Sequence, residues 1–344
     1  MSILEVRDLR KRFNLEAGFF ARFGRFVYAV NDVSFAIGEN EIYGLVGESG
    51  CGKTTTARLM VRMYEADSGE IRFRGTEDVR ALKARALKAY RERVKYVFQD
   101  PARSLNLRKS VYDVLTSGYR HSSLWPGHRA ARDEAGAILE EVGLSPTDLA
   151  RRPTEFSGGQ RQRISIARGL IMRPEVLICD EVVSALDVSI QGQILNLLLD
   201  IRESRGLSFL FIAHDLKVAG YFCDRIGVMY RGELMEEAPA RDLFKAALHP
   251  YTKLLYSSVA GSGRAGNQPA NRDRNPAGAS RSAGDPGLRQ VGGMAPVFGQ
   301  VRPGGRRAGQ REPRDERHRG QEASRVGPRS SRGPGRLPRL RRSD

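Results

Sequence analysis

The sequence is short of cysteine and has no long apolar run. Its three cysteines, Cys51, Cys179 and Cys223, have neither the paired spacing of a disulfide framework nor the clustered spacing of a zinc site. No apolar run approaches the roughly 18 residues that a membrane-spanning helix needs, and the first residues lack the basic-then-apolar order of a signal peptide. We therefore expect a protein of the reducing cytoplasm. Its 344 residues, 40% of them hydrophobic, are enough for a sizeable core.

Positive charge is abundant overall but modest in most of the chain. The formal net charge is +17, yet residues 261–344 alone carry 19 Arg, no Lys and 7 acidic residues, a net of +12. The first 260 residues hold 38 basic against 33 acidic side chains, which is ordinary for a soluble enzyme. The charge is therefore weak support for a nucleic-acid-binding function.

A glycine-rich stretch at residues 47–55 fits the pattern G-x-x-x-x-G-K-[ST], with an apolar run before it and helical periodicity after it. Glycines let the backbone wrap a polyphosphate with its N–H groups inward, and the following helix adds the positive end of its dipole. In such a loop Lys53 reaches the β- and γ-phosphates and the Thr54 hydroxyl binds Mg²⁺. We predict a nucleoside triphosphate site formed by Gly47, Glu48, Ser49, Gly50, Cys51, Gly52, Lys53, Thr54 and Thr55.

The rest of the pattern is that of an α/β protein with a helical insert. Period-two alternation and short apolar runs predict strands at residues 6–13, 27–37, 70–73, 94–98, 176–179 and 209–213. Apolar residues at helical spacing predict helices at residues 54–64, 79–93, 130–142 and 190–201. Strand patterns disappear after residue 110, so we expect a helical insert at about residues 101–170.

Polar side chains follow three of the predicted strands. Gln99 follows one, Asp180 and Glu181 follow the next, and His214 follows the last. The carboxyl ends of strands are where open α/β sheets place ligand groups, so we assign all four residues to one site. Adjacent carboxylates face opposite ways, which lets Asp180 hold Mg²⁺ through water while Glu181 takes a proton from an attacking water.

A second glycine-rich turn precedes a basic helical pattern at residues 156–168. The start of that helix is a second place where backbone N–H groups can bind an anion. A chain with two separate sites of this kind needs either two ligands or a partner chain. The residues of the turn are Ser157, Gly158, Gly159 and Gln160.

These motifs, together with residues 184–187, follow one another in the order found in ABC transporter ATP-binding subunits, and the sequence resembles that family. Further stretches resemble the oligopeptide/dipeptide importer branch, from about residue 3 to about residue 260: residues 98–101, 104–106, 155–163, 184–191 and 249–252. We expect the resemblance to stop after Val259 and the family's cysteine-containing C-terminal extension to be missing. It implies a P-loop ABC ATPase core with a mostly parallel sheet, an N-terminal antiparallel β subdomain and an inserted α-helical subdomain.

The resemblance also implies a chemistry. Such a subunit hydrolyses ATP with Mg²⁺, which makes Gln99, Glu181 and His214 the expected catalytic residues. The expected Mg²⁺ ligands are Thr54, Gln99 and Asp180.

A dimer is implied as well. In a head-to-tail pair of identical or different ATPase subunits, residues 157–160 of one subunit close the ATP site of the other, and Asp187 lies in the D-loop. The expected partners are transmembrane permease subunits and, indirectly, an extracytoplasmic solute-binding protein, with no nucleic acid. The subunit would be peripheral to the cytoplasmic face of the cell membrane.

Several alternatives stay open at this point. A cytosolic ABC ATPase acting on nucleic acid or ribosomes would use the basic tail, although no second nucleotide-binding domain is visible. A second alternative is a non-catalytic partner subunit, although all the reacting residues are present. Val182 stands where the family usually has proline, which could loosen the loop behind Glu181. The aromatic that stacks on adenine is also unassigned; the candidates are Phe23, Phe26 and Tyr28.

We treat residues 1–260 as the ABC ATP-binding domain and residues 261–344 as a tail. The tail has 16 Gly and 9 Pro but only eight Leu, Val and Phe, so it cannot bury enough apolar surface to offset the entropy of ordering, and disorder is expected. Its loss of lysine suggests the hypothesis of a frameshifted reading frame. The alternative is a genuine Arg-rich arm that binds anionic lipid or RNA.

Overall fold

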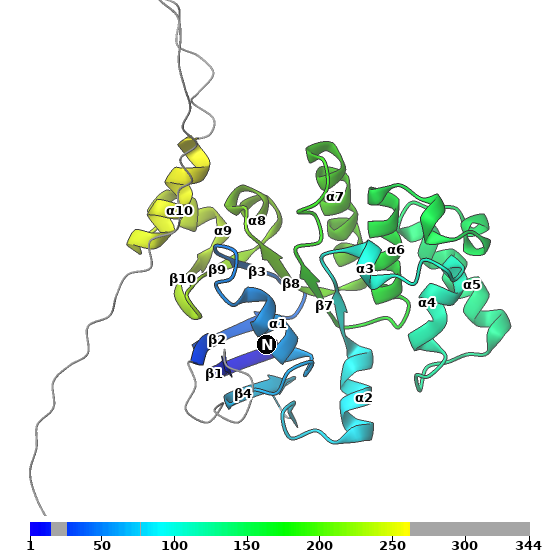
Figure 1. Cartoon of the computed structure of the whole chain (residues 1–344), viewed down its shortest axis with the longest axis horizontal. Coiled ribbons are helices and arrows are strands. Elements are labelled where there is room, and N and C mark those ends of the chain that lie inside the picture. The colour runs from blue at the N-terminus through cyan, green and yellow to red at the C-terminus, as the bar shows by residue number, and fades with distance from the viewer. Residues whose placement is uncertain (15–25, 76, 262–344) are drawn as a thin grey trace, which may run out of the picture. The chain divides into compact units, whose positions relative to one another are not determined.

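The computed structural model describes residues 1–14, 26–75 and 77–261, and two β-sheets form its framework (Figure 1). Phe23 and the tail from residue 262 lie outside the described residues. The predictions made for them are therefore not examined by the structure.

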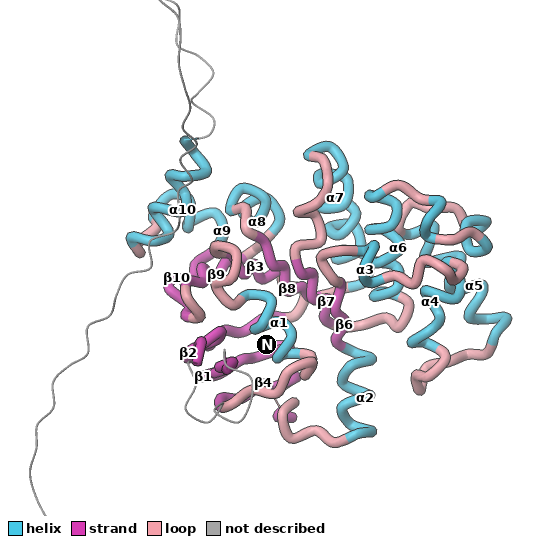
Figure 2. The backbone as a smooth tube through the Cα atoms, in the orientation of Figure 1, coloured by secondary structure: helices cyan, strands magenta, loops and turns pink. Residues whose placement is uncertain are grey.

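A six-stranded sheet with the order β10-β9-β3-β8-β7-β6 runs across the centre of Figure 2. Its neighbouring strands are parallel except for β9 and β10, which are antiparallel. The strands are β3 (Ile42–Val46), β6 (Val94–Val97), β7 (Val176–Asp180), β8 (Ser208–Ala213), β9 (Arg225–Tyr230) and β10 (Glu233–Pro239). Every residue of β3, β7 and β8 is buried, which explains why these strands are continuous apolar runs.

The second sheet is antiparallel and has the order β2-β1-β4-β5. Its strands are β1 (Ser2–Asn14), β2 (Phe26–Gly38), β4 (Ser68–Phe73) and β5 (Glu77–Asp78). Near the start of β1, Ile3, Leu4 and Val6 are buried in one core. The expected N-terminal antiparallel subdomain and the mostly parallel central sheet are both confirmed.

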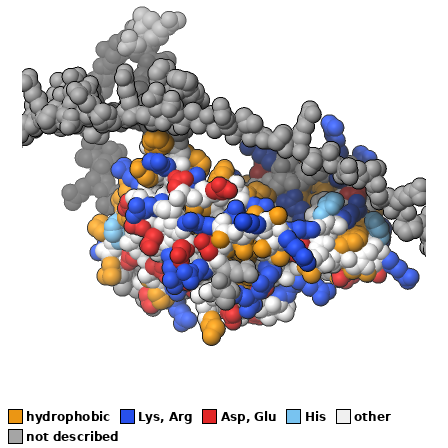
Figure 3. Space-filling view, turned by 90° about the horizontal axis from the view of Figure 1, so that it is seen from below, with side chains coloured by type: hydrophobic (Ala, Val, Ile, Leu, Met, Phe, Trp, Pro, Cys, Tyr) orange, Lys and Arg blue, Asp and Glu red, His pale blue; other side chains and the backbone are white. Residues whose placement is uncertain are grey.

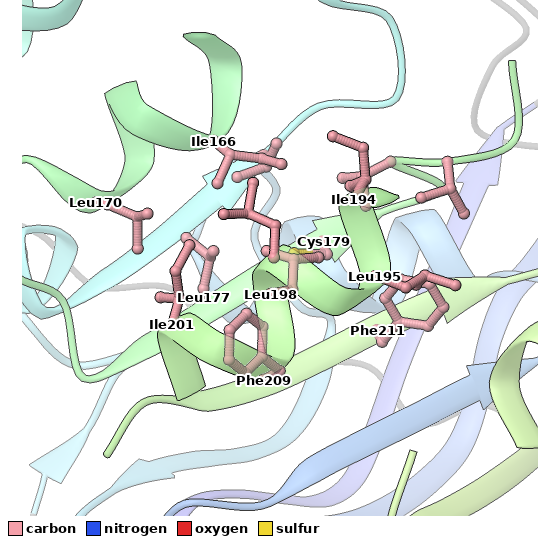
Figure 4. Close-up of a cluster of buried hydrophobic side chains, with 14 of the residues drawn as sticks. Ile166, Leu170, Leu177, Cys179, Ile194, Leu195, Leu198, Ile201, Phe209 and Phe211 are labelled. Atoms are coloured by element: carbon pink, nitrogen blue, oxygen red, sulfur yellow. The ribbon is translucent and has the colours of Figure 1, made fainter. Parts of the chain in front are cut away.

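The side chains of the central strands alternate between two cores. On β8, Phe209 and Phe211 enter one core, whereas Leu210 and Ile212 enter the other, which also contains residues of the antiparallel sheet such as Leu4. The first core includes side chains from α6, α7 and β7, shown in Figure 4: Ile166, Leu170, Leu177, Cys179, Ile194, Leu195, Leu198 and Ile201. Both faces of the central sheet are thus covered.

Helices surround the central sheet, and α3 to α6 gather on one side of it (Figure 1). Of the described helices, none is both long and apolar enough to cross a bilayer. The helices are α1 (Lys53–Met60), α2 (Ala84–Arg93), α3 (Pro101–Ser104), α4 (Val111–Tyr119), α5 (His128–Glu141), α6 (Gly158–Leu170), α7 (Val188–Arg205), α8 (Leu216–Phe222), α9 (Ala240–Ala246) and α10 (Pro250–Gly261), with the 3₁₀ turns η2 (Pro146–Ala150) and η3 (Pro153–Glu155).

Two expectations about the elements were wrong. The helix predicted at residues 79–93 begins only at Ala84, because Val79 is buried and its N–H donates to Ile71 O of β4. The Asp78 carboxylate also accepts a hydrogen bond from Arg80 N, which closes a turn there instead. The second error is an omission, since β9 and β10 were not predicted; β10 is rich in Glu, which hides its strand character.

Candidate active site

Four strands deliver the predicted polar residues to one edge of the central sheet. The glycine-rich loop follows β3, His214 follows β8, Asp180 ends β7 and Gln99 lies two residues after β6. These four strands are parallel neighbours in the order β3-β8-β7-β6, so their carboxyl ends meet at the same edge. The structure therefore brings the sequence-predicted groups together.

The glycine-rich loop is packed too closely for side chains at two positions. A Cβ on Gly47 would lie 2.1 Å from Met229 O of β9, and one on Gly52 would lie 2.1 Å from Ala29 O of β2. Gly52 also has φ +112°, a backbone conformation that favours glycine. Glycine is thus required where the loop touches β9 and β2.

Lys53 lies inside the loop, with only 3% of its surface exposed. Its ammonium donates to Gly47 O at 2.8 Å and to Glu48 O at 2.9 Å, and Cys51 Sγ lies 3.7 Å away. Burial raises the pKa of the Cys51 thiol, and the neighbouring Lys53 opposes that rise. The positive charge therefore already points into the space that the loop encloses.

Asp180 is buried, and both of its carboxylate oxygens accept hydrogen bonds. The Thr54 hydroxyl donates to Oδ1 at 2.9 Å, and the Tyr96 hydroxyl of β6 donates to Oδ2. Burial and the Asp180 carboxylate raise the pKa of Tyr96, which keeps its hydroxyl protonated. Hydroxyl and carboxylate oxygens side by side are the hard ligands that Mg²⁺ prefers, so this pair fits a magnesium site. No pattern in the sequence points to Tyr96, because its partner Asp180 belongs to another strand.

Gln99 and His214 both approach the carboxylate of Glu181. Gln99 Nε2 donates to Glu181 Oε2 at 2.7 Å, and His214 Nδ1 lies 3.9 Å from the same oxygen. Glu181 has φ +48°, and its N–H donates to Ile212 O of β8 at 3.1 Å. A non-glycine residue in the left-handed region is costly and occurs preferentially at functional sites. The carboxylate can accept a proton here, with an amide and an imidazole beside it.

The loop behind Glu181 is well packed. Val182 is 1% exposed and belongs to the core that contains α6 and α7. The Ser184 hydroxyl donates to Glu181 O at 2.9 Å, and Leu186 N donates to Val183 O at 3.2 Å. Burial and these hydrogen bonds fix the loop without a proline at residue 182.

The second glycine-rich turn caps α6. Ser157 Oγ accepts from Gln160 N at 3.3 Å, and Gln160 Oε1 accepts from Ser157 N at 3.0 Å, which is a reciprocal capping box. A Cβ on Gly159 would lie 2.7 Å from Ile190 Cγ2, so this turn packs against the first turn of α7. Asp187 precedes α7, is exposed, and its carbonyl accepts from Gln191 N.

Two of the aromatics considered for adenine stacking are described. The guanidinium of Arg12 lies over the ring of Phe26, with its central carbon 4.6 Å from the ring centroid. Tyr28 is 54% exposed and directly precedes Ala29, whose carbonyl lies against Gly52. Tyr28 is therefore attached to backbone that contacts the glycine-rich loop.

Surface charge is mixed. On the face shown in Figure 3, Lys and Arg side chains are interspersed with Asp and Glu side chains. Several basic groups are paired, as where Arg74 and Arg93 both contact Glu175. This face matches the small net charge of the first 260 residues rather than a basic stripe for nucleic acid.

Two protein families match the chain. One, described as "ABC transporter", matches residues 30–184. The other, described as "Oligopeptide/dipeptide transporter, C-terminal region", matches residues 235–283. The second match continues to residue 283, which corrects the expectation that the resemblance stops after Val259. The absence of the family's cysteine-containing extension stays a prediction.

Curated bacterial relatives align with about three quarters of the chain. The oligopeptide transport ATP-binding protein AppF of Bacillus subtilis is 44% identical over 258 residues, 75% of this chain and 78% of AppF. OppF of the same species, also named an oligopeptide transport ATP-binding protein, is 46% identical and covered to 82%. The glutathione import ATP-binding protein GsiA of Escherichia coli is 46% identical over 257 residues, 75% of this chain, but only 41% of GsiA is covered.

Solved structures share the fold. CbiO1 of Clostridium perfringens, part of an ABC transporter complex, superposes with a TM-score of 0.62 at 25% identity, covering 71% of this chain and 91% of CbiO1. The ATP-binding cassette MJ0796, solved as a dimer with ADP and Pi, gives a TM-score of 0.60 at 25% identity, covering 69% of this chain and 99% of MJ0796. The fold, the family matches and the long alignments agree, and the chain belongs to the ATP-binding subunits of ABC transporters, in their oligopeptide/dipeptide branch.

Proposed function

We propose that this subunit hydrolyses ATP to energise an importer of oligopeptides, dipeptides or a related small solute. The proposal rests on two hydrogen-bonded pairs that lie at one sheet edge beside the glycine-rich loop, Thr54 with Asp180 and Gln99 with Glu181. The relatives are named for oligopeptide and glutathione transport, which supports a peptide-like solute.

The phosphate side of the site is built on residues 47–55. Lys53 would exchange its two carbonyl contacts for phosphate oxygens, and the backbone N–H groups at the start of α1 would complete the cradle. Thr54 and Asp180 would hold Mg²⁺, with Gln99 as a further ligand. The ion would neutralise charge on the phosphates.

Glu181 is the proposed general base. Its carboxylate would take a proton from the water that attacks the terminal phosphate. Gln99 donates to Glu181 Oε2, so in this arrangement it orients the carboxylate, and His214 approaches the same oxygen. The presence of every reacting group argues for a working subunit rather than a non-catalytic one.

In the proposed mechanism, each ATP site is completed by residues of a second subunit. Ser157, Gly158, Gly159 and Gln160 form a capped helix start whose described side-chain hydrogen bonds stay within the turn. In the proposed head-to-tail dimer this turn closes the ATP site of the partner, and Asp187 lies between the two sites. The structural neighbour MJ0796 was solved as a dimer with ADP and Pi, which supports a dimeric assembly.

Docking on permease subunits would use the groove beside Gln99. This groove is lined by Arg58, Phe98, Gln99, Asp100, Arg103, Ser104 and Asp180. Because it contains both Gln99 and Asp180, a permease segment seated there would sense the nucleotide site directly. The subunit would then be peripheral to the cytoplasmic face of the membrane, with a solute-binding protein acting from the other side.

Purification of the chain from its own membranes tests this function. Mass spectrometry of the purified complex should find permease subunits in stoichiometric amount. Recovery with ribosomes or DNA and without permease subunits would overturn the importer and favour the nucleic-acid alternative.

A further inference from the structure

The C-terminal helix α10 touches the glycine-rich loop through one side chain. Glu48 N donates to the hydroxyl of Tyr251 at 3.3 Å, across 203 residues of sequence. Tyr251 is 9% exposed, and it lies within the segment that matches the oligopeptide/dipeptide C-terminal region. That C-terminal region therefore reaches Glu48, the second residue of the loop.

The ring of Tyr251 is held by the hairpin between β9 and β10. It packs on Tyr230, the last residue of β9, with ring centroids 4.3 Å apart. The same hairpin contacts the loop through its backbone, since Gly232 N donates to Cys51 O at 2.8 Å and Met229 O lies against Gly47. Hairpin and helix together fix the loop backbone at three positions.

The start of α10 is itself fixed to β10. The Glu236 carboxylate accepts hydrogen bonds from Leu248 N at 2.7 Å and His249 N at 3.0 Å. His249 Nδ1 then accepts from Tyr251 N at 3.1 Å, which sets the backbone of Tyr251. The hydroxyl thus reaches Glu48 from a rigid support.

We propose that Tyr251 is a positioning residue for the phosphate loop, through which the C-terminal region sets the affinity for ATP. A glycine-rich loop loses much conformational freedom when it wraps a ligand, and a loop that is already fixed loses less. Tyr251 touches none of the reacting groups, so it acts through Glu48. The inference rests on the proposed role of residues 47–55 in ATP binding.

Tyrosine-to-phenylalanine substitutions separate the hydroxyl from the ring. Tyr251→Phe keeps the stacking on Tyr230 but removes the acceptor for Glu48 N. Tyr230→Phe is the matched control, because it removes a hydroxyl from the same ring pair and leaves in place the Tyr251 hydroxyl that accepts from Glu48 N. Each full-length variant is examined by ATP titration calorimetry, steady-state hydrolysis and thermal unfolding without nucleotide.

Tyr251→Phe should raise the Kd and the KM for ATP roughly 2- to 10-fold, as expected for one lost hydrogen bond, with kcat unchanged. Its unfolding temperature without nucleotide should match that of Tyr230→Phe, whose Kd should equal that of the parent chain. An unchanged Kd in Tyr251→Phe would overturn the inference, as would a fall in kcat alone.

A parallel variant distinguishes this inference from the phosphate-loop assignment. Lys53→Ala should lose ATP binding whatever Tyr251 does. If Lys53→Ala loses binding and Tyr251→Phe does not change it, the positioning role is wrong and the loop assignment stands. If Lys53→Ala binds ATP normally, the loop assignment itself is wrong, and the positioning role with it.

Discussion

Two glycines of the phosphate loop make a matched pair for a stability experiment. Gly52 has φ +112°, and a Cβ there would meet Ala29 O at 2.1 Å and Met229 Cε at 2.8 Å. Gly50 has φ +81°, and a Cβ there would meet nothing within 4 Å. Alanine at either position has an unfavourable backbone conformation, but only at residue 52 does it also collide with backbone.

The difference between the two variants can be worked out from these contacts. A left-handed conformation costs an alanine about 1–2 kcal/mol, offset by about 0.4–1 kcal/mol because alanine restricts the unfolded chain more than glycine does. These contributions are common to both variants. At residue 52 the Ala29 carbonyl must also move by about 1 Å, and forcing an extra methyl into a packed site costs about 1–3 kcal/mol. Gly52→Ala should therefore be less stable than Gly50→Ala by that amount.

Urea unfolding of both variants without nucleotide measures this difference directly. In a folded region of this size, each kcal/mol also lowers the unfolding temperature by about 2–4 °C. Equal stabilities, within about 0.5 kcal/mol, would refute the packing of β2 against the loop. A larger loss at residue 50 would refute it as well.

Two further predictions concern the dimer and pH. An equimolar mixture of inactive Lys53→Ala and inactive Ser157→Arg chains should regain part of the ATPase activity, since one mixed site keeps both an intact phosphate loop and an intact second glycine-rich turn, residues 157–160. No recovery in a demonstrated homodimer would contradict closure of the ATP site by the partner subunit. Burial lowers the pKa of Lys95 to about 8, with Glu92 opposing the shift. Above pH 8 the folded chain releases this proton while the unfolded chain keeps it up to about pH 10.4, so stability against urea should rise over that interval. Lys95→Met should remove this rise, and an equally steep rise in that variant would assign it to other groups.

Most of the site geometry could be anticipated from strand ends. Gln99, Asp180, Glu181 and His214 lie at or just after the ends of strands that were predicted from the sequence, and parallel strands bring their carboxyl ends to one edge. The capping of α6 by Ser157 and Gln160 is local and follows from residue spacing alone. Such features depend on neighbours in sequence or on a regular sheet.

The missed features are contacts between distant segments. Tyr96 donates to a carboxylate 84 residues away, and Tyr251 accepts from a loop 203 residues away. Side-chain periodicity says which face a residue occupies but not which group lies opposite. The hairpin of β9 and β10 could not be predicted because β10 is charged. This strand lies at the sheet edge, paired with β9 alone within the described sheet, and an edge strand does not need an alternating apolar pattern.

The role of Glu181 as general base is tested most directly by measuring ATP binding and hydrolysis together in Glu181→Gln. This variant should bind ATP, hydrolyse it roughly 10²–10⁴-fold more slowly, and accumulate as a closed dimer. Lys53→Ala should instead lose binding. Unchanged turnover in Glu181→Gln would contradict the proposed mechanism at its centre.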